Sequence, residues 1–138
     1  MSDGYTIQSL DPPAWEVIGR GIREYNTQQA GDGRAIYLCF VLHAPDGSVA
    51  GGVIGETHWN WLFINLMWIP EELRGKGYGH TLLLTAEDEG RKRGATHAYL
   101  DTFSFQAPEF YKKHGYQVFG VLDDFPPGHK RYYLAKRL

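Results

Sequence analysis

The sequence predicts a single α/β (α+β) domain, in which one mixed, mostly antiparallel central sheet carries helices on both faces. Three observations indicate this class. Residues 61–69 are apolar at all but one position, as in a central strand covered on both sides. A basic, glycine-rich segment follows at residues 74–79, and an amphipathic helix begins there. The length of 138 residues suits one hydrophobic core, so we expect one domain over residues 1–138.

The N-terminal quarter predicts a strand, a helix and a loop. Residues 5–10 alternate between apolar and polar side chains, which favours a short first strand. Asp11 is typical of a helix N-cap, and Pro12 is tolerated at the first helical position. Apolar residues then recur at helical spacing up to Tyr25. Residues 26–34 are glycine-rich and polar, so a loop is expected there.

The rest of the chain alternates between strand and helix patterns. Residues 35–43 and 49–58 are strand-like and flank an Asp-Gly turn, which predicts a β-hairpin. In the helix after the glycines, Leu82, Leu83, Ala86 and Gly90 share one face, and Glu87 is assigned to the polar face. Further strands are expected at residues 98–102, 116–122 and 130–138, with a short helix at 107–114. Lys130, Arg131, Lys136 and Arg137 read as an ordinary polar strand face.

Composition excludes several classes of protein. With 43% hydrophobic and 14% aromatic residues, the chain is of a folded, globular type. Its net charge of −2 gives no electrostatic reason to bind nucleic acid or a membrane surface. Cys39 stands alone inside an apolar run, which predicts a buried, unreactive thiol and a reducing cytoplasm. Neither a secretory leader, a membrane span nor a metal-ligand spacing is visible, so we expect a cytoplasmic protein without a metal.

The segment from Arg74 to Gly90 has the features of a phosphate-binding turn. Its glycines let the backbone approach a ligand closely, and the helix that follows presents unpaired N–H groups. The spacing excludes two common phosphate loops, because neither GxxxxGK[ST] nor GxGxxG is present. The pattern that fits is Arg74-x-x-Gly77-x-Gly79. A second segment, Phe110-Tyr111-Lys112-Lys113-His114-Gly115-Tyr116, forms an FYxxxGF-type turn.

Together the two motifs resemble those of the GNAT superfamily of acyl-CoA-dependent N-acyltransferases, and the predicted element order is similar from end to end. The resemblance implies that acetyl-CoA is the co-substrate. Its pyrophosphate would be held by Arg74, Gly75, Lys76, Gly77, Tyr78, Gly79 and His80. The backbone of Met67 and Ile69 would pair with the pantetheine amides, where two strands splay apart. Ser104 occupies a position that is often asparagine in the family, so a pantetheine or CoA hydrogen bond is assigned to Ser104 or to Gln106.

The catalytic groups are assigned in the same way. Tyr111 matches the tyrosine that protonates the departing CoA thiolate, and the alternative is a core tyrosine. An amine with a pKa of about 10.4 is almost entirely protonated at neutral pH, so its attack requires a proton acceptor or a water chain. Residues 61–69 contain no carboxylate. The base is therefore sought in Glu56, His58 or ordered water, and Glu56 is the candidate that we assign.

The sequence thus predicts an N-acetyltransferase that moves the acetyl group of acetyl-CoA directly to a primary amine, expected to be on a small cationic molecule. Asp101, Thr102, Asp123 and Asp124 are further candidates for contact with that molecule, with ordinary structural roles as the alternative. A second hypothesis is a CoA-binding sensor or interaction module without turnover. The missing carboxylate and Ser104 favour the sensor, whereas Tyr111 and the intact glycines favour the enzyme. A homodimer is the expected assembly.

Overall fold

The computed structural model describes residues 3–138 and divides the chain into two compact units. The first unit ends at Gly33, and the second spans Arg34–Leu138. None of the helices in residues 3–138 combines the length and the apolar character that crossing a bilayer requires.

The first unit consists of an extended segment and helix α1 (Trp15–Ala30). The strand predicted at residues 5–10 is wrong, because a strand needs a neighbour to pair with and the other described secondary structure of this unit is helical. The helix begins after Ala14 rather than at Asp11, and it continues through most of the predicted loop until Gly31, whose φ is +80°. None of its side chains is buried.

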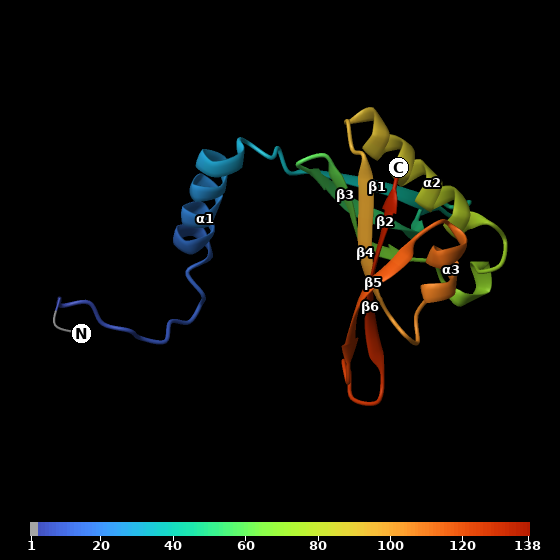
Figure 1. The fold of residues 1–138 in the computed structure, drawn as a ribbon. Coiled ribbons are helices and arrows are strands. Elements are labelled where there is room, and N and C mark those ends of the chain that lie inside the picture. The colour runs from blue at the N-terminus through green and yellow to red at the C-terminus, as the bar shows by residue number, and fades with distance from the viewer. Residues whose placement is uncertain (1–2) are drawn as a thin grey trace. The chain divides into compact units, whose positions relative to one another are not determined.

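The second unit contains one sheet, whose described strands are ordered β1-β2-β3-β4-β6-β5 (Figure 1). Every neighbouring pair is antiparallel except β3 and β4, which are parallel and connected through helix α2. The prediction of a mixed, mostly antiparallel sheet is confirmed. The elements are β1 (Ile36–His43), β2 (Val49–His58), β3 (Trp61–Trp68), η1 (Glu71–Leu73), α2 (Tyr78–Lys92), β4 (His97–Phe103), α3 (Pro108–Lys113), β5 (Gln117–Asp123) and β6 (Lys130–Arg137).

The β1–β2 hairpin forms where the Asp-Gly pair predicted it. Gly47 takes a φ of +86°, which an L side chain rarely adopts. Asp46 closes the turn, since its Oδ1 accepts hydrogen bonds from the backbone N–H and the hydroxyl of Ser48 at 2.9 and 2.6 Å. These bonds lower the pKa of the Asp46 carboxyl, with the hydroxyl bond contributing most. The turn chemistry therefore sets the register of the first two strands.

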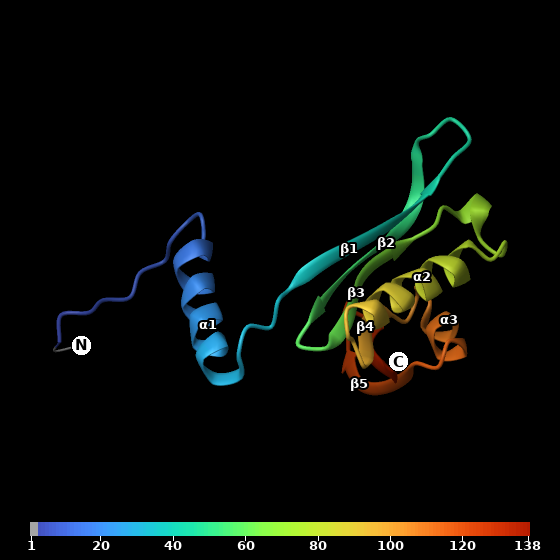
Figure 2. The ribbon, with the colours of Figure 1, turned by 90° about the horizontal axis from the view of Figure 1, so that it is seen from above.

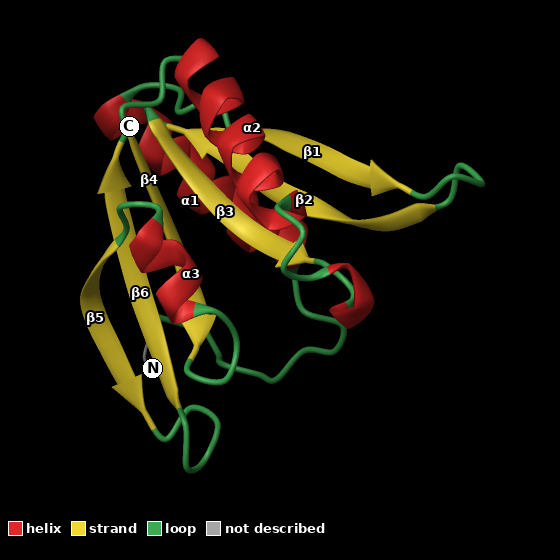
Figure 3. Ribbon diagram, turned by 90° about the vertical axis from the view of Figure 1, so that its right-hand side faces the viewer, coloured by secondary structure: helices red, strands yellow, loops and turns green. Residues whose placement is uncertain are grey.

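Helices α2 and α3 cover the same face of the sheet, as Figure 2 and Figure 3 show. Leu83 and Ala86 of α2 are fully buried and belong to one core cluster with Leu62 and Leu100 of the sheet. A Cβ at Gly90 would lie 3.1 Å from Leu62 Cδ2, so glycine at this position allows α2 to approach β3 closely. Tyr111 and Tyr116 join the same cluster from the α3 side. The layer thus holds α2 and α3 rigidly against β3 and β4.

The opposite face of the sheet, which we call the open face, carries the alternate side chains, among them Tyr37, Cys39, Glu56, Phe63, Tyr99 and Asp101. It is rich in aromatic rings; Phe63 and Tyr99 stack with centroids 4.8 Å apart. Cys39 lies on this face and is exposed, so the prediction of a buried thiol is wrong. The apolar run around Cys39 is real, but strand alternation directs Leu38 rather than Cys39 to the core.

A buried ion pair connects α2 with β6. Glu87 is 0% exposed, and it accepts hydrogen bonds from Lys136 Nζ at 2.9 Å and from the Tyr116 hydroxyl at 2.8 Å. Burial, followed by the charge of Glu87 and this hydrogen bond, raises the pKa of Tyr116. The assignment of Glu87 to a polar helix face and of Lys136 to an ordinary polar strand face is wrong. Glu87 lies one turn after Leu83 and therefore shares the buried face of α2.

We expect a Lys136→Met variant to lose about 2 kcal/mol of unfolding free energy, because it leaves the Glu87 carboxylate buried without its cation. The Lys136 side chain is 18% exposed, which keeps the loss below that of a fully buried pair. Denaturant unfolding followed by tryptophan fluorescence measures the change. A Glu87→Gln/Lys136→Met double variant should recover most of the loss. A double variant as unstable as the single one would show that the charge pair is not the cause.

Candidate active site

The parallel strands β3 and β4 separate halfway along their length. They pair from Trp61 with His97 up to Ile64 with Leu100, and no pairing follows, although β3 continues to Trp68 and β4 to Phe103. Figure 3 shows the two strands diverging beyond this point. The separation begins where the β2–β3 register shifts, because Ile54 pairs with Leu66 but Gly55 pairs with Ile64. The extra residue, Asn65, is therefore a β-bulge in β3.

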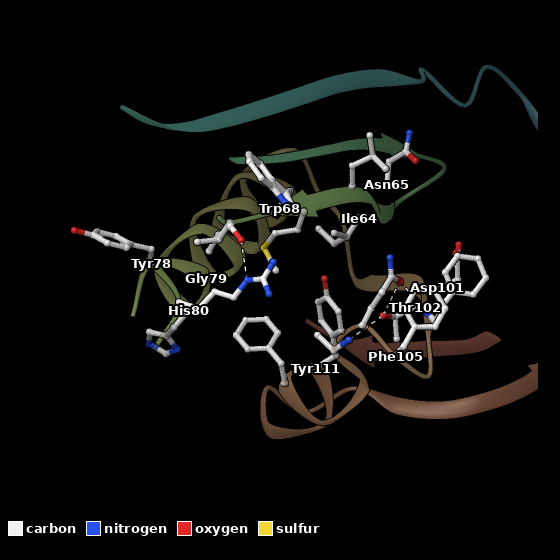
Figure 4. Close-up of a pocket in the computed structure, with 18 of the residues that line it drawn as sticks. Ile64, Asn65, Trp68, Tyr78, Gly79, His80, Asp101, Thr102, Phe105 and Tyr111 are labelled. Atoms are coloured by element: carbon white, nitrogen blue, oxygen red, sulfur yellow. Dashed lines mark hydrogen bonds between the residues drawn. The ribbon is translucent and has the colours of Figure 1, made fainter. Parts of the chain in front are cut away.

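A cavity of about 840 Å³ occupies the space between the separated strands and extends to the start of α2. In Figure 4 it runs from His80 and Gly79 at one end to Thr102 and Phe105 at the other, with Tyr111 between them. This places the glycine-rich loop and the motif tyrosine at one continuous site, as the two sequence motifs led us to expect.

The loop before α2 leaves its N-terminus open to a ligand. Gly75 and Gly77 have φ values of +76° and +89°, and a Cβ on either would meet no atom within 4 Å. Gly77 is the residue that precedes the helix, and no described side chain caps the N–H groups of the first turn. Arg74 Nε donates to the Ile69 carbonyl at 2.9 Å, which ties the loop to the end of β3. Open N–H groups and the helix dipole together favour an anion here.

Tyr111 is held by the core while its hydroxyl remains reachable from the cavity. The residue is 8% exposed, and its ring packs edge-on against Phe110 and Tyr116. The Tyr111 hydroxyl has no hydrogen-bond partner among the described residues, and its oxygen is not fully buried. Burial, and secondarily the charge of Asp101, raises the pKa of Tyr111 to about 12. The phenol is therefore protonated throughout the physiological range and available as a donor.

The structure brings most of the predicted site residues together. The cavity is lined by Met67, Ile69, Arg74, Gly75, Gly77, Tyr78, Gly79, His80 and Tyr111. Lys76, Ser104 and Glu56 are not among the residues that line it. Glu56 lies on the open face as the cross-strand neighbour of Phe63, which does line the cavity. Glu56, on β2, is thus next to the cavity wall, which is formed in part by Phe63 of β3.

Ser104 and Gln106 hold the turn between β4 and α3. Ser104 N–H donates to the Lys130 carbonyl at 2.8 Å, and its hydroxyl accepts from the Lys130 N–H at 3.0 Å. The Gln106 side-chain oxygen accepts from the Phe103 N–H at 2.8 Å and from the Thr102 hydroxyl at 3.2 Å. Gln106 lines the cavity, whereas the hydrogen bonds of Ser104 are made to Lys130 of β6. Of the two candidates for a contact with CoA, Gln106 is the better placed.

Sequence reasoning missed a cation and an aromatic cluster at the far end of the cavity. Arg131, assigned to a plain polar face, donates from Nε and Nη2 to Asp101 Oδ1 at 3.0 and 2.7 Å. Its guanidinium also lies over the rings of Phe103, Phe125 and Tyr133. Phe105 stacks on Phe103 with an interplanar angle of 3°. The pairing of Phe103 in β4 with Arg131 in β6 brings these distant segments together, and no local sequence pattern predicts that pairing.

The fold and the cavity define an acyl-CoA N-acyltransferase architecture: a mixed sheet whose central strands separate beside a glycine-rich helix start. The model of the acetyltransferase (GNAT) family matches residues 4–116, and the chain belongs to this family. Acetyl-CoA is accordingly its co-substrate. The open N–H groups of α2 suit the phosphates of this molecule, and the diverging backbones of β3 and β4 suit its amide-containing pantetheine arm.

Known proteins similar to the chain agree with this assignment. An acetyltransferase of Agrobacterium fabrum (strain C58) is 35% identical over 127 residues, which cover 92% of this chain and 93% of that protein. A blasticidin-S acetyltransferase of Streptomyces morookaense is 38% identical over 105 residues, or 75% of this chain and 74% of that protein. The crystal structure of an acetyltransferase from Bacillus cereus superposes over 100% of both chains with a TM-score of 0.90 and 34% identity.

Proposed function

We propose that the protein transfers the acetyl group of acetyl-CoA directly to a primary amine of a small cationic molecule, within a ternary complex. The observation that carries the proposal is the single cavity that joins an uncapped helix N-terminus, two separated strands and a protonated buried phenol. Each of these parts serves one step: binding the phosphates, placing the thioester and protonating the leaving group. A simple CoA-binding module would require the first two parts but not the third.

In the proposed complex residues 74–80, which form the loop and the first turn of α2, hold the pyrophosphate through backbone N–H groups, with Arg74 and Lys76 adding positive charge. On the side that faces β4, the backbone beyond Ile64 has no strand partner among the described residues, and there Met67 and Ile69 meet the pantetheine amides in the manner of an added strand. The Ile69 carbonyl already accepts a bond from Arg74, so this strand end is fixed before the ligand arrives. The thioester then lies where β3 and β4 separate, within reach of Tyr111.

The proposed chemistry balances with the groups at hand. The neutral amine nitrogen attacks the thioester carbonyl carbon, a backbone N–H at the end of β3 stabilises the oxyanion, and the carbon–sulfur bond breaks. The attacking nitrogen loses a proton to the base or to water as the amide forms, and Tyr111 gives its phenol proton to the departing thiolate and regains a proton from solvent. A pKa of about 12 makes this phenol a weak acid, but burial raises the pKa of the thiol as well, which reduces the mismatch.

The open face beside the cavity suits a cationic acceptor. Glu56, which has no hydrogen-bond or ion-pair partner among the described residues, and Asp101 lie close to Tyr99. Their charges raise the pKa of Tyr99 after the larger effect of burial. Asp101 uses Oδ1 for Arg131 and retains Oδ2. Carboxylates that share a sheet face with stacked aromatic rings such as Phe63 and Tyr99 favour an ammonium group. The name of the blasticidin-S relative also points to a small molecule as acceptor.

Glu56 is our candidate for the base that takes the proton of the attacking ammonium, directly or through water. We expect Glu56→Gln to lower kcat by about 100-fold, since this is the lower end of the range for a lost general base. The Kd of acetyl-CoA should be unchanged, because Glu56 does not line the cavity. Raising the pH should restore part of the activity, because more of the amine is then neutral.

Steady-state kinetics from pH about 6 to about 9 measures this effect. A His58→Gln variant is the matched control, because His58 is the next residue of β2 on the same face. An unchanged kcat in Glu56→Gln together with a fall in His58→Gln would transfer the role to His58. Unchanged rates in both would assign the proton to ordered water.

Assembly and location are part of the same proposal. The apolar stripe of α1, with Trp15, Ile18, Ile22 and Tyr25, is exposed, and an amphipathic helix of this kind normally buries such a stripe. We propose a homodimer that works in the cytoplasm, with residues 1–138 acting as one catalytic domain. Sedimentation equilibrium tests the dimer, and a monomer at micromolar concentration would overturn it.

A further inference from the structure

His80 and His114 form a hydrogen-bonded pair beside the start of α2. His80 Nδ1 lies 2.8 Å from His114 Nε2, and the ring centroids are 5.0 Å apart. His114 follows directly after α3, and its Nδ1 lies 2.8 Å from the carbonyl oxygen of Phe110. The His114 ring also packs against the Phe110 ring at 4.6 Å. His80, in the first turn of α2, is thus connected to the end of α3 through a second histidine.

The Phe110 carbonyl determines which nitrogens of His114 and His80 carry the protons. A carbonyl oxygen accepts, so His114 Nδ1 carries the proton and donates it to Phe110. In a neutral ring the other nitrogen is bare, so His114 Nε2 accepts and His80 Nδ1 donates. In the neutral pair both rings are therefore Nδ1–H tautomers. His80 Nε2 is the nitrogen that remains for a ligand, since it has no partner among the described residues.

We propose that His114 is a positioning residue, which orients His80 to bind a phosphate group of acetyl-CoA. This assignment rests on the proposed phosphate site at residues 74–80. His80 lines the cavity beside Gly79 and Tyr78, as Figure 4 shows. A phosphate oxygen accepts, so His80 meets it as an imidazolium: Nε2–H donates to the phosphate while Nδ1–H stays on His114. The hydrogen bond to His114 restricts the rotation of the His80 ring.

The two segments that carry these histidines also contain other titratable residues, namely Glu71, Glu72, Arg74, Lys76 and Tyr78 before His80, and Glu109, Tyr111, Lys112 and Lys113 in α3. Glu109 is paired with Lys112 within α3 at 3.1 Å.

The first test needs no ligand and no variant. Long-range ¹H–¹⁵N correlation spectra of histidine-labelled protein at about pH 8 report which ring nitrogen carries the proton. We expect His80 and His114 both to show the Nδ1–H pattern. The Nε2–H pattern on either ring would overturn the assignment.

The second test is calorimetric titration with acetyl-CoA at about pH 6.5. His114→Leu should weaken the Kd about fivefold, and His114→Gln, whose side-chain oxygen can replace Nε2 as acceptor, should stay within about twofold of wild type. S-acetylpantetheine, which has no phosphate, should bind both variants as it binds wild type. His43→Leu is the matched control, since His43 Nδ1 also contacts a carbonyl, that of Gly47 at 3.2 Å, far along the chain from the loop.

The outcomes separate the two proposals. An unchanged Kd in His114→Leu, or an equal loss for S-acetylpantetheine, would overturn the positioning role while the proposed function stands. A wild-type protein that binds no acetyl-CoA would overturn the phosphate site itself, and the assignment with it. Thermal unfolding of each variant verifies that the affinities are those of folded protein.

Discussion

A Gly77→Val variant is expected to lose acetyl-CoA affinity by more than about 100-fold, or about 2.7 kcal/mol. Gly77 sits directly before α2 with a φ of +89°, where a β-branched side chain is strained. The added Cβ meets no protein atom within 4 Å, so valine projects into the open space at the helix start. That space is where the proposed pyrophosphate approaches the backbone. Isothermal titration with acetyl-CoA measures the loss.

Backbone strain alone needs a control, and Gly47 provides it. Gly47 has a φ of +86° and likewise nothing within 4 Å of an added Cβ, but it lies in the β1–β2 turn and does not line the cavity. Gly47→Val should lower Tm by an amount similar to that in Gly77→Val and leave the Kd unchanged. Wild-type affinity in Gly77→Val would place the phosphate site elsewhere. A loss of affinity in both variants would attribute the effect to strain.

Tyr111→Phe is expected to lower kcat by about 100-fold and to change the Kd of acetyl-CoA by less than about twofold. Removing the hydroxyl leaves no described partner unpaired, so the fold should be nearly as stable as wild type. With its pKa raised to about 12, the phenol stays protonated below about pH 11. The wild-type rate should therefore not fall through Tyr111 ionisation as pH rises to about 10. Pre-steady-state and steady-state rates at several pH values measure both effects.

Tyr116→Phe is the matched control for the loss of a buried tyrosine hydroxyl. Tyr116 is 2% exposed and donates to Glu87, and it does not line the cavity. This variant should lose stability, because Glu87 loses a donor, but keep kcat at temperatures where it is folded. An unchanged rate in Tyr111→Phe would remove Tyr111 from the mechanism. Equal rate losses in the two variants would indicate a general disturbance of the core.

Features with a local physical cause could be predicted from the sequence. The Asp-Gly turn specified the β1–β2 hairpin, and the basic glycine segment specified the helix start that opens onto the cavity. The motif containing Tyr111 placed that residue at the same cavity as the loop. In each of these cases the residues that determine the geometry are close together in the chain.

Features that depend on long-range pairing could not be predicted. Arg131 reaches Asp101 because β6 pairs with β4, and Glu87 meets Lys136 through packing across the sheet. A run of apolar residues does not tell which alternate side chains face the core, so Cys39 was assigned to the wrong face. The strand predicted at residues 5–10 failed for a related reason, since alternation alone does not supply a pairing neighbour.

The most direct measurement of the central claim is acetyl transfer to a pool of amines. Purified protein is incubated with acetyl-CoA and polyamines, amino acids, aminoglycosides, streptothricin-like compounds and lysine peptides. Mass spectrometry detects the acetylated products, and free CoA is quantified. The account predicts that a small cationic amine gains one acetyl group, that CoA is released in equal amount, and that Tyr111→Phe slows both. Tight binding of acetyl-CoA with no acetylated product from any amine would contradict it and favour a CoA-binding sensor.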